Sequence, residues 1–137
     1  MDERLKKIID NSDNIVFFGG AGVSTESNIP DFRSEQGLYN AKQQFGLSPE
    51  EMLSHSFFMR HMKTFFEYYR KNLIYPDAMP NKAHLALARL EEQGKLKAIV
   101  TQNIDGLHQK AGSKTVFELH GNVNRNYCMD CGKFFDT

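Results

Sequence analysis

The spacing of apolar residues divides the first part of the chain into a short helix and a strand. Leu5, Ile8 and Ile9 recur at helical spacing, which predicts an amphipathic helix over residues 4–11. The continuous apolar run at residues 14–18 has the length of a β-strand and ends at a pair of glycines. Such a run is typical of a strand in a parallel sheet covered by helices, so we expect both of its faces to be buried.

The middle of the chain combines a long polar segment with helical patterns. Residues 24–45 are polar and contain one proline, which predicts a loop of about 20 residues that is functional or mobile. Helices are expected after it, from a Ser-Pro-Glu-Glu start at 48–51, over 56–74 and over 81–93. The first start combines an N-cap serine, a first-turn proline and a capping-box glutamate. Pro76 and Gly94 end the two longer helices.

The second half returns to strand patterns. Residues 96–101 and 115–119 are apolar runs of strand length, and a short helix is expected at 107–110 between them. The alternation of strands and helices predicts an α/β fold with a parallel sheet. Residues 127–137 have the pattern of a small metal-binding knuckle.

Composition and charge narrow the class of protein. The 137 residues fit one domain of ordinary size, and 17 basic side chains balance 17 acidic ones. This balance argues against nucleic acid as a partner, which usually requires a basic excess. No apolar run approaches the ~18 residues of a membrane span, and the first residues lack the apolar segment of a secretory signal. We therefore expect a cytoplasmic protein without nucleic-acid or membrane partners.

A glycine-rich motif follows the first strand. Gly20 and Gly22 supply a G-x-G sequence, whose bare backbone can approach a phosphate closely. Thr25 stands where the ordinary dinucleotide fingerprint has its third glycine. Taken alone, the motif fits a phosphate-binding turn or a simple turn between a strand and a helix.

The long loop contains a proline followed by Asp31, Phe32 and Arg33. An aromatic ring beside a guanidinium offers a ligand both a π face and a phosphate partner. The alternative is a loop that its apolar residues hold to the core, with the charged groups in solvent.

A second polar segment directly follows the strand at 96–101. Gln102, Asn103 and Asp105 lie where open α/β sheets bind ligands, outside the carboxyl ends of their strands. The alternative is an Asx turn closed by Asn103 or Asp105, with Gly106 at positive φ.

His120 follows the last predicted strand and precedes a glycine. Histidine suits general-base catalysis because the unperturbed pKa of imidazole lies near neutrality. The other histidines fall on helices or their flanks, where we expect surface or packing roles. Of these, His108 is nearest the predicted site and ranks below His120.

Cys128 and Cys131 are the only two cysteines, which excludes a disulfide scaffold. The sequence C-x-x-C-G is a turn that presents two thiolates to one zinc ion. A structural zinc site needs about four ligands, so these residues form half of one. A redox-active C-x-x-C pair is the competing interpretation.

Taken together and in this order, the motifs resemble those of the sirtuins, the NAD-dependent protein lysine deacylases. The matching blocks are Gly20–Ser24, Ile29–Arg33, Thr101–His108, Leu119–Gly121 and the C-x-x-C pair. The resemblance implies a Rossmann-like parallel sheet in residues 1–122, with a loop and helical insertion at about 24–79. Residues 123–137 would begin a small zinc-binding module.

The resemblance also implies roles for individual residues. The cofactor NAD would be held by Gly20, Ala21, Gly22, Ser24, Asp31, Phe32, Arg33, Gln102, Asn103, Ile104 and Asp105. Of these, Phe32 would cover the reacting sugar, and Asn103 would order the nicotinamide ribose as part of the catalytic set. His120 would be the general base, and Cys128 and Cys131 would bind zinc.

The partner implied by the resemblance is an acyl-lysine protein or peptide, whose acyl group passes to ADP-ribose as nicotinamide leaves. Family members that prefer acidic acyl groups carry a Tyr and an Arg three residues apart on the helix after the cofactor loop. Glu67 stands where that Tyr belongs, so we expect acetyl or another neutral acyl group.

Two features depart from the family pattern. Asn28 stands where many members have glycine, and asparagine tolerates left-handed backbone better than most residues. Sirtuin catalytic cores also continue to a second cysteine pair, so we expect this chain to be an N-terminal portion, inactive alone. The alternatives are an NAD or ADP-ribose-binding module, a protein ADP-ribosyltransferase and a zinc-knuckle interaction domain.

Overall fold

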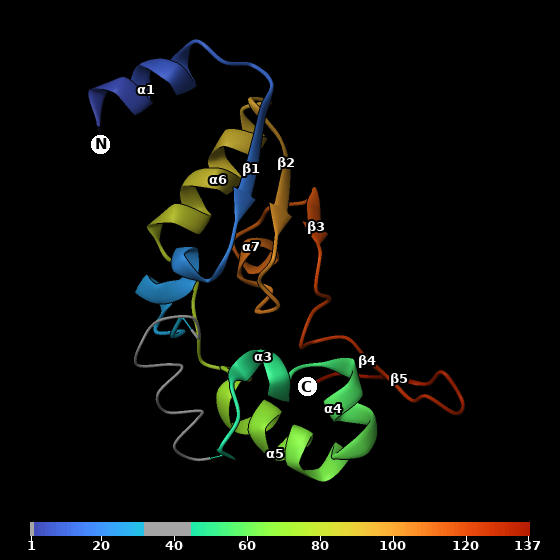
Figure 1. The fold of residues 1–137 in the computed structure, drawn as a ribbon. Coiled ribbons are helices and arrows are strands. Elements are labelled where there is room, and N and C mark those ends of the chain that lie inside the picture. Colours follow the sequence, from blue (N-terminus) through green and yellow to red (C-terminus); the bar gives the residue numbers. More distant parts are fainter. Residues whose placement is uncertain (1, 32–44) are drawn as a thin grey trace.

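A computed structural model describes residues 2–31 and 45–137 (Figure 1). The helices are α1 (Glu3–Asp10), the 3₁₀ helix η1 (Ala21–Ser27), α3 (Pro49–Met52), α4 (His55–Arg60), α5 (Met62–Asn72), α6 (Lys82–Glu92) and α7 (Leu107–Lys110). The strands are β1 (Ile15–Gly19), β2 (Leu96–Thr101), β3 (Val116–Glu118), β4 (Asn126–Tyr127) and β5 (Phe134–Phe135). No helix among the described residues has the length and apolar character needed to cross a membrane.

The first three strands form a parallel sheet in the order β1-β2-β3, which confirms the predicted α/β class. Its hydrogen bonding continues past the strand ends, because Gln102 N donates to Gly19 O (3.0 Å) and Leu119 N donates to Thr101 O (2.9 Å). The carboxyl ends of all the strands therefore meet at one edge. The loops that follow these strands carry the polar motifs.

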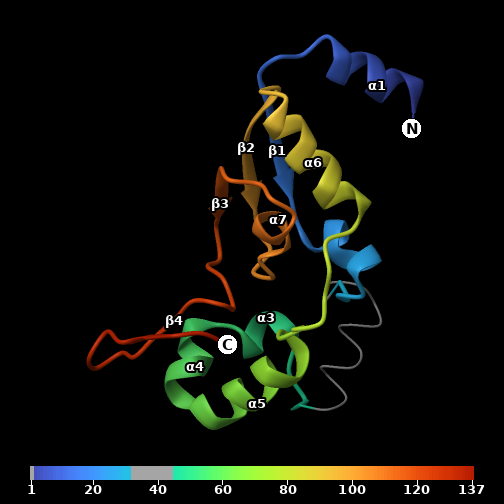
Figure 2. The ribbon, with the colours of Figure 1, turned by 180° about the vertical axis from the view of Figure 1, so that it is seen from behind.

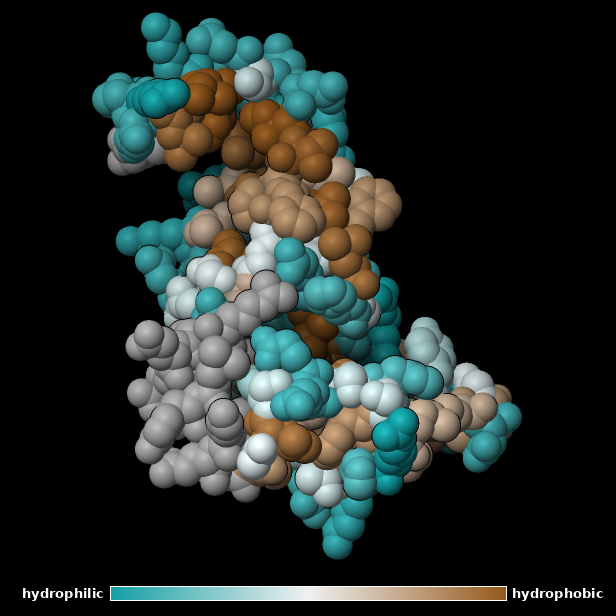
Figure 3. All heavy atoms as spheres, in the orientation of Figure 1, coloured by the Kyte–Doolittle hydropathy of each residue, from teal (hydrophilic) through white to brown (hydrophobic). Residues whose placement is uncertain are grey.

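Only one face of this sheet is covered by helices in the described part of the chain. Helices α6 and α7 lie on the same side of β1 and β2, in front of the strands in Figure 2. On the other face Val16 and Phe18 are 59% and 62% exposed, and Phe117 and Leu119 are exposed beside them. Apolar surface is visible over this part of the molecule in Figure 3. The prediction that β1 is buried on both faces is therefore wrong for the described residues, because no described helix packs on the second face.

Helices α3, α4 and α5 pack around a separate apolar cluster of Met52, Tyr68 and Leu73. The predicted capping box is present, with Ser48 Oγ accepting from Glu51 N (3.2 Å) and Glu51 Oε2 accepting from Ser48 N (2.9 Å).

The predicted helix over 56–74 is split at His61, where φ is −133° and ψ is 45°. The break lets the ring of Phe58 on α4 pack edge-on against Phe65 on α5, with ring centroids 5.0 Å apart.

The predicted loop at 24–45 begins as helix rather than loop, because η1 extends to Ser27. Asn28 ends η1 in left-handed backbone (φ 62°), as expected for asparagine at this position. Asn81, the N-cap of α6, holds η1 from outside by donating to Val23 O (2.7 Å) and Ser27 Oγ (3.0 Å). Phe32 and Arg33 lie outside the described residues.

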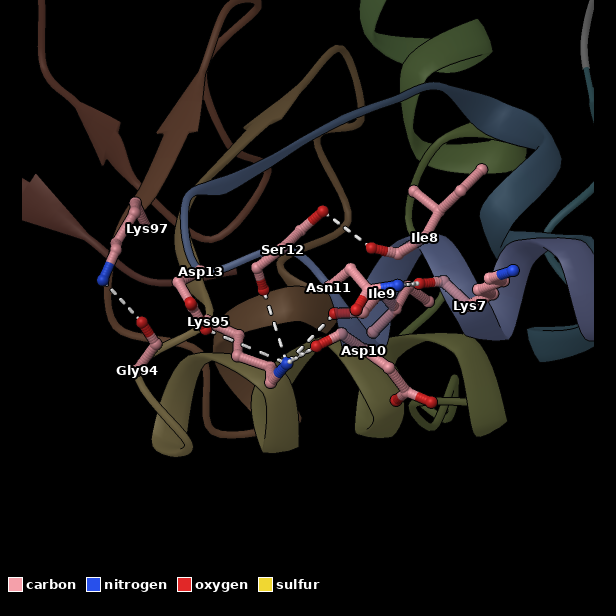
Figure 4. A network of polar contacts seen from close by, with 10 residues as sticks. All are labelled: Lys7, Ile8, Ile9, Asp10, Asn11, Ser12, Asp13, Gly94, Lys95 and Lys97. Carbon is pink, nitrogen blue, oxygen red and sulfur yellow. Dashed lines mark hydrogen bonds and ion pairs between the residues drawn. The ribbon is translucent and has the colours of Figure 1, made fainter.

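One lysine joins α1 to the sheet (Figure 4). Lys95, just before β2, donates from Nζ to the carbonyl oxygens of Ile9 (3.1 Å), Asp10 (2.9 Å) and Ser12 (3.4 Å). Helix C-termini expose unpaired carbonyls and a partial negative charge, so an ammonium group there is stabilising. Lys95 therefore fixes where α1 ends relative to β2.

We predict that Lys95→Ala accelerates amide hydrogen exchange in α1 and lowers the free energy of unfolding by about 1 kcal/mol. Lys97→Ala is the matched control, because Lys97 lies two residues further along and its Nζ donates to Gly94 O instead of to α1. Hydrogen-exchange mass spectrometry measures both. Equal protection of α1 in the two variants would contradict the capping role of Lys95.

Candidate functional site

Three of the predicted site residues form one hydrogen-bonded cluster at the carboxyl edge of the sheet. Ser24 on η1 is 0% exposed, and its Oγ donates to Asp105 Oδ2 (2.7 Å). The same Oγ accepts from Asn103 Nδ2 (3.0 Å). A buried hydroxyl with both functions satisfied has a fixed orientation. The cluster therefore joins the loop after β1 to the loop after β2.

The loop after β2 is held in a tight turn. Asn103 N donates to Thr101 Oγ1 (3.0 Å), and Leu107 N donates to Asp105 Oδ1 (2.9 Å). The second bond is the Asx turn that the sequence allows as an alternative, and Gly106 has the expected positive φ of 72°. A Cβ at Gly106 would also lie 3.0 Å from Asn124 Nδ2, so a larger residue there would have to displace the Asn124 side chain as well as adopt positive φ. The Asx turn and the contact with Ser24 use different oxygens of one carboxylate, so they coexist.

The glycine motif leaves bare backbone beside this cluster. A Cβ added at Gly20 or Gly22 would meet no atom within 4 Å, so neither glycine is needed for packing within the described chain. The space beside them is large enough for a group that approaches the backbone closely.

His120 is exposed at the same edge, next to β2. Its Nδ1 lies 3.0 Å from the carbonyl oxygen of Gln102. A carbonyl can only accept a hydrogen bond, so Nδ1 carries the proton in this contact. In the neutral ring the lone pair is then on Nε2, which is the form a general base requires.

Two buried histidines lie behind the Asp105 turn. His84 on α6 and His108 on α7 are 0% and 1% exposed, and their ring centroids are 4.8 Å apart. His84 Nδ1 accepts from Asn81 N, whereas His84 Nε2 and both nitrogens of His108 have no hydrogen-bond partner among the residues that the structure describes. Burial and the neighbouring His84 lower the pKa of His108 to about 4, although Asp105 opposes this shift. Burial also lowers the pKa of His84, again against Asp105.

The remaining predicted residues differ in their placement. Ile104 turns away from the polar cluster and packs against the apolar cluster of α3 and α5. Asp31 is half-buried and is the last described residue before the gap. The structure thus brings together Gly20, Ala21, Gly22, Ser24, Gln102, Asn103, Asp105 and His120.

His84 and His108 have the packing role expected for them, but the depth of their burial is not evident from the sequence. The signal available for His84 was the pair Asn81 and His84, three residues apart at a helix start, which is capping-box spacing. No sequence pattern indicates that His108 meets His84, because this contact depends on how α6 and α7 pack.

The C-x-x-C segment forms a tight turn between β4 and β5. Cys128 N donates to Lys133 O (2.9 Å), Gly132 N donates to Cys128 O (2.9 Å), and Gly132 has a positive φ of 69°. The backbone N–H groups of Cys131 and Asp130, directed at the sulfur, lower the pKa of the Cys128 thiol. Among the described residues, no three or more His, Cys, Asp or Glu side chains are grouped to hold a metal ion.

A family model described as the Sir2 family matches residues 20–137. The chain belongs to the Sir2 family. It is 70% identical over 132 residues to an NAD-dependent protein deacetylase of Clostridium acetobutylicum, an alignment that covers 96% of this chain and 54% of that protein. The polar cluster, the exposed imidazole and the glycine motif are thus features of a Sir2-family chain.

Solved Sir2 structures share the fold. The crystal structure of a Sir2 homologue with NAD is 40% identical, has a TM-score of 0.83, and is matched over 100% of this chain and 52% of that chain. A Sir2 variant solved with a deacetylated p53 peptide and 3'-O-acetyl ADP-ribose is 40% identical, with a TM-score of 0.84, over 98% and 52%. The chain therefore spans about half the length of the relatives it matches.

The buried histidine pair predicts that the protein loses stability in acid. Between pH 6.5, the ordinary pKa of histidine, and about 4, the unfolded chain binds a proton that folded His108 does not. The free energy of unfolding should therefore fall with pH in this window, by up to about 3 kcal/mol. His108→Phe should flatten this dependence in urea unfolding measured at several pH values.

His55→Phe is the control, because it removes an exposed imidazole at the start of α4. It should leave the pH dependence as in the unmodified protein. An unchanged slope in His108→Phe would show that the buried pair does not set the acid stability.

Proposed function

We propose that the protein containing this chain is an NAD-dependent protein lysine deacetylase, which releases nicotinamide and forms O-acetyl-ADP-ribose. The observation that carries the proposal is the hydrogen-bonded cluster of Ser24, Asn103 and Asp105 beside His120, in a chain of the Sir2 family. The relative in Clostridium acetobutylicum has this name. Because the chain spans about half of that protein, the activity is proposed for a polypeptide of the relatives' full length.

The bare backbone at Gly20 and Gly22 fits a pyrophosphate. Side chains are absent there, although the fold leaves room for them, and backbone N–H groups are the usual donors to phosphate oxygens. We assign Gly20, Ala21 and Gly22 to this role. Bound NAD would supply an electrophilic ribose carbon, to which the acyl oxygen of the modified lysine would bond as nicotinamide leaves.

The polar cluster suits an amide and a sugar. Asp105 and Ser24 fix each other, so the carboxylate is held in place before any ligand arrives. We assign Asp105 and the main chain of Ile104, whose side chain packs in the apolar cluster, to the carboxamide of nicotinamide. Gln102 and Asn103 are assigned to its ribose. Preorganised groups of this kind contribute to catalysis without reorganising during the reaction.

His120 is assigned as the general base. The carbonyl of Gln102 holds Nδ1–H, so Nε2 is free to take a proton from a ribose hydroxyl. Phe32 is assigned as the cover that excludes water from the reacting carbon, and Asp31 and Arg33 are assigned to hold the cofactor. Exclusion of water matters here because loss of nicotinamide leaves a cation-like sugar that water would capture.

The substrate is proposed to be an acetyl-lysine protein or peptide. A Sir2 variant solved with a deacetylated p53 peptide supports this class of partner. Glu67 is exposed on α5, and its charge would repel an acidic acyl chain. Acetyl or another neutral acyl group is therefore the preferred substrate. We propose no nucleic-acid or membrane partner, and we propose the cytoplasm as the location.

Cys128 and Cys131 are proposed to supply two of the four ligands of a zinc ion. The donor set fits, since the turn brings two thiols together and lowers the pKa of Cys128, which favours the thiolate that zinc binds. Residues 123–137 would then belong to a zinc module and residues 1–122, with the insertion at about 24–79, to the NAD-binding domain. The ion would have a structural role.

We predict that the full-length protein converts NAD and an acetyl-lysine peptide to free lysine, nicotinamide and O-acetyl-ADP-ribose, measured by mass spectrometry. His120→Ala should lower kcat by about 10²–10⁴-fold, because it removes the base. His55→Ala, an exposed change on α4, is the control. Near-normal turnover of His120→Ala would contradict the assignment, and ADP-ribose attached to protein would indicate a transferase instead.

We predict that the full-length protein contains about one zinc ion per chain, and that Cys128→Ser with Cys131→Ser abolishes it. Metal analysis of the purified proteins measures this content. The thermal midpoint should fall in the same variant, because structural zinc contributes to folding. Zinc content that does not change would favour the redox interpretation of the pair.

A further inference from the structure

A single carboxylate gathers three donors at the end of β3. The side chain of Glu118 is 5% exposed, and its Oε1 accepts from Gln109 Nε2 on α7 (2.8 Å) and from Asn122 Nδ2. Its Oε2 accepts from the guanidinium of Arg125, with which it forms an ion pair. None of the assignments above uses Glu118. A charge this deeply buried requires such partners, so its contacts are strongly coupled.

These contacts close a loop around His120. Asn122 and Arg125 lie four and seven residues after Glu118, and both return to its carboxylate. His120 and Gly121, whose φ is 79°, lie in the bend between these anchor points. The backbone that carries the imidazole is therefore held at both ends by one side chain.

The segment 118–125, which the carboxylate of Glu118 holds at both ends like a clamp, also touches the turn after β2. Val123 N donates to Ile104 O (2.9 Å), and Asn124 approaches Gly106. The position of this segment is therefore coupled to the loop that carries Asn103 and Asp105. It is also the segment that sets the distance from His120 to the carbonyl of Gln102.

We propose that Glu118 is a positioning residue for His120, and that its carboxylate holds the bend in the shape that keeps Nδ1–H on Gln102 O. The inference rests on the proposed function of His120 as base. Without the contacts of Glu118, the backbone around His120 becomes more mobile, so His120 Nδ1 donates to Gln102 O only part of the time. The proton is then no longer held on Nδ1, and the tautomer with an unprotonated Nε2 is less populated. Such supporting contacts typically change activity by about 10–100-fold.

The variants separate positioning from general stabilisation. In Glu118→Gln, the amide oxygen can still accept from Gln109 and Asn122, but an NH₂ group faces Arg125. Arg125→Ala removes the same contact from the other side. Glu91→Gln is the matched control, because Glu91 accepts from Lys114 N (2.9 Å) and Thr115 N (2.8 Å) beside the opposite end of β3.

In the full-length enzyme we expect Glu118→Gln and Arg125→Ala each to lower kcat about 10-fold, with the KM for NAD within about 2-fold. The double variant Glu118→Gln with Arg125→Ala should have a kcat no lower than that of the slower single variant, because each single change already removes the same Glu118–Arg125 interaction. Glu91→Gln should lower the thermal midpoint but leave kcat within about 2-fold. The ¹⁵N spectrum of His120 should show Nδ1–H in the unmodified protein and a tautomer mixture in Glu118→Gln.

The outcomes distinguish this inference from the proposed function. An unmodified enzyme without deacetylase activity contradicts the proposed function, while the ¹⁵N spectra still test the clamp. An active enzyme in which Glu118→Gln keeps its kcat and its His120 tautomer overturns the inference alone. Equal losses of kcat in Glu118→Gln and Glu91→Gln also overturn it, since the effect would then be general destabilisation.

Discussion

The geometry of the site depends on one buried hydroxyl. Ser24 lies on η1, 81 residues before Asp105 and 79 before Asn103, yet its Oγ exchanges hydrogen bonds with both. A buried polar atom without partners costs about 1–3 kcal/mol, so the two loops are stable in this arrangement only when they meet. The parallel sheet makes the meeting possible, because it delivers the ends of β1 and β2 to the same edge.

Apolar packing supports the same loop from its other side. Ile104, between Asn103 and Asp105, inserts into the cluster built by α3 and α5, while Leu107 is buried two residues after Asp105. Alternate residues of one short loop thus serve opposite purposes, polar contact and anchorage. The helical insertion between β1 and β2, which contains α3 and α5, therefore contributes to the site, because it holds the loop that carries Asp105.

Features that depend on local chemistry were predictable from the sequence. The capping box at Ser48, the left-handed Asn28, the positive φ of Gly106 and the parallel strands all follow from the residues involved and their neighbours. The bare face of β1, the break at His61 and the contact of His84 with His108 were not predictable. They depend on which elements face each other, and periodicity along a single segment carries no such information.

The low pKa of His108 has its main consequence for the hydrogen bonds that the Asp105 carboxylate makes. A protonated His108 would be attracted to Asp105, as the opposing effect of Asp105 on that pKa shows. A charged imidazole behind the turn would compete with Ser24 Oγ and Leu107 N for the carboxylate. Burial beside His84 keeps the ring neutral through the physiological range, so the carboxylate oxygens remain directed at the hydroxyl and the turn. The buried pair therefore preserves the polar cluster because it stays uncharged, whereas Glu118 holds the His120 bend through its negative charge.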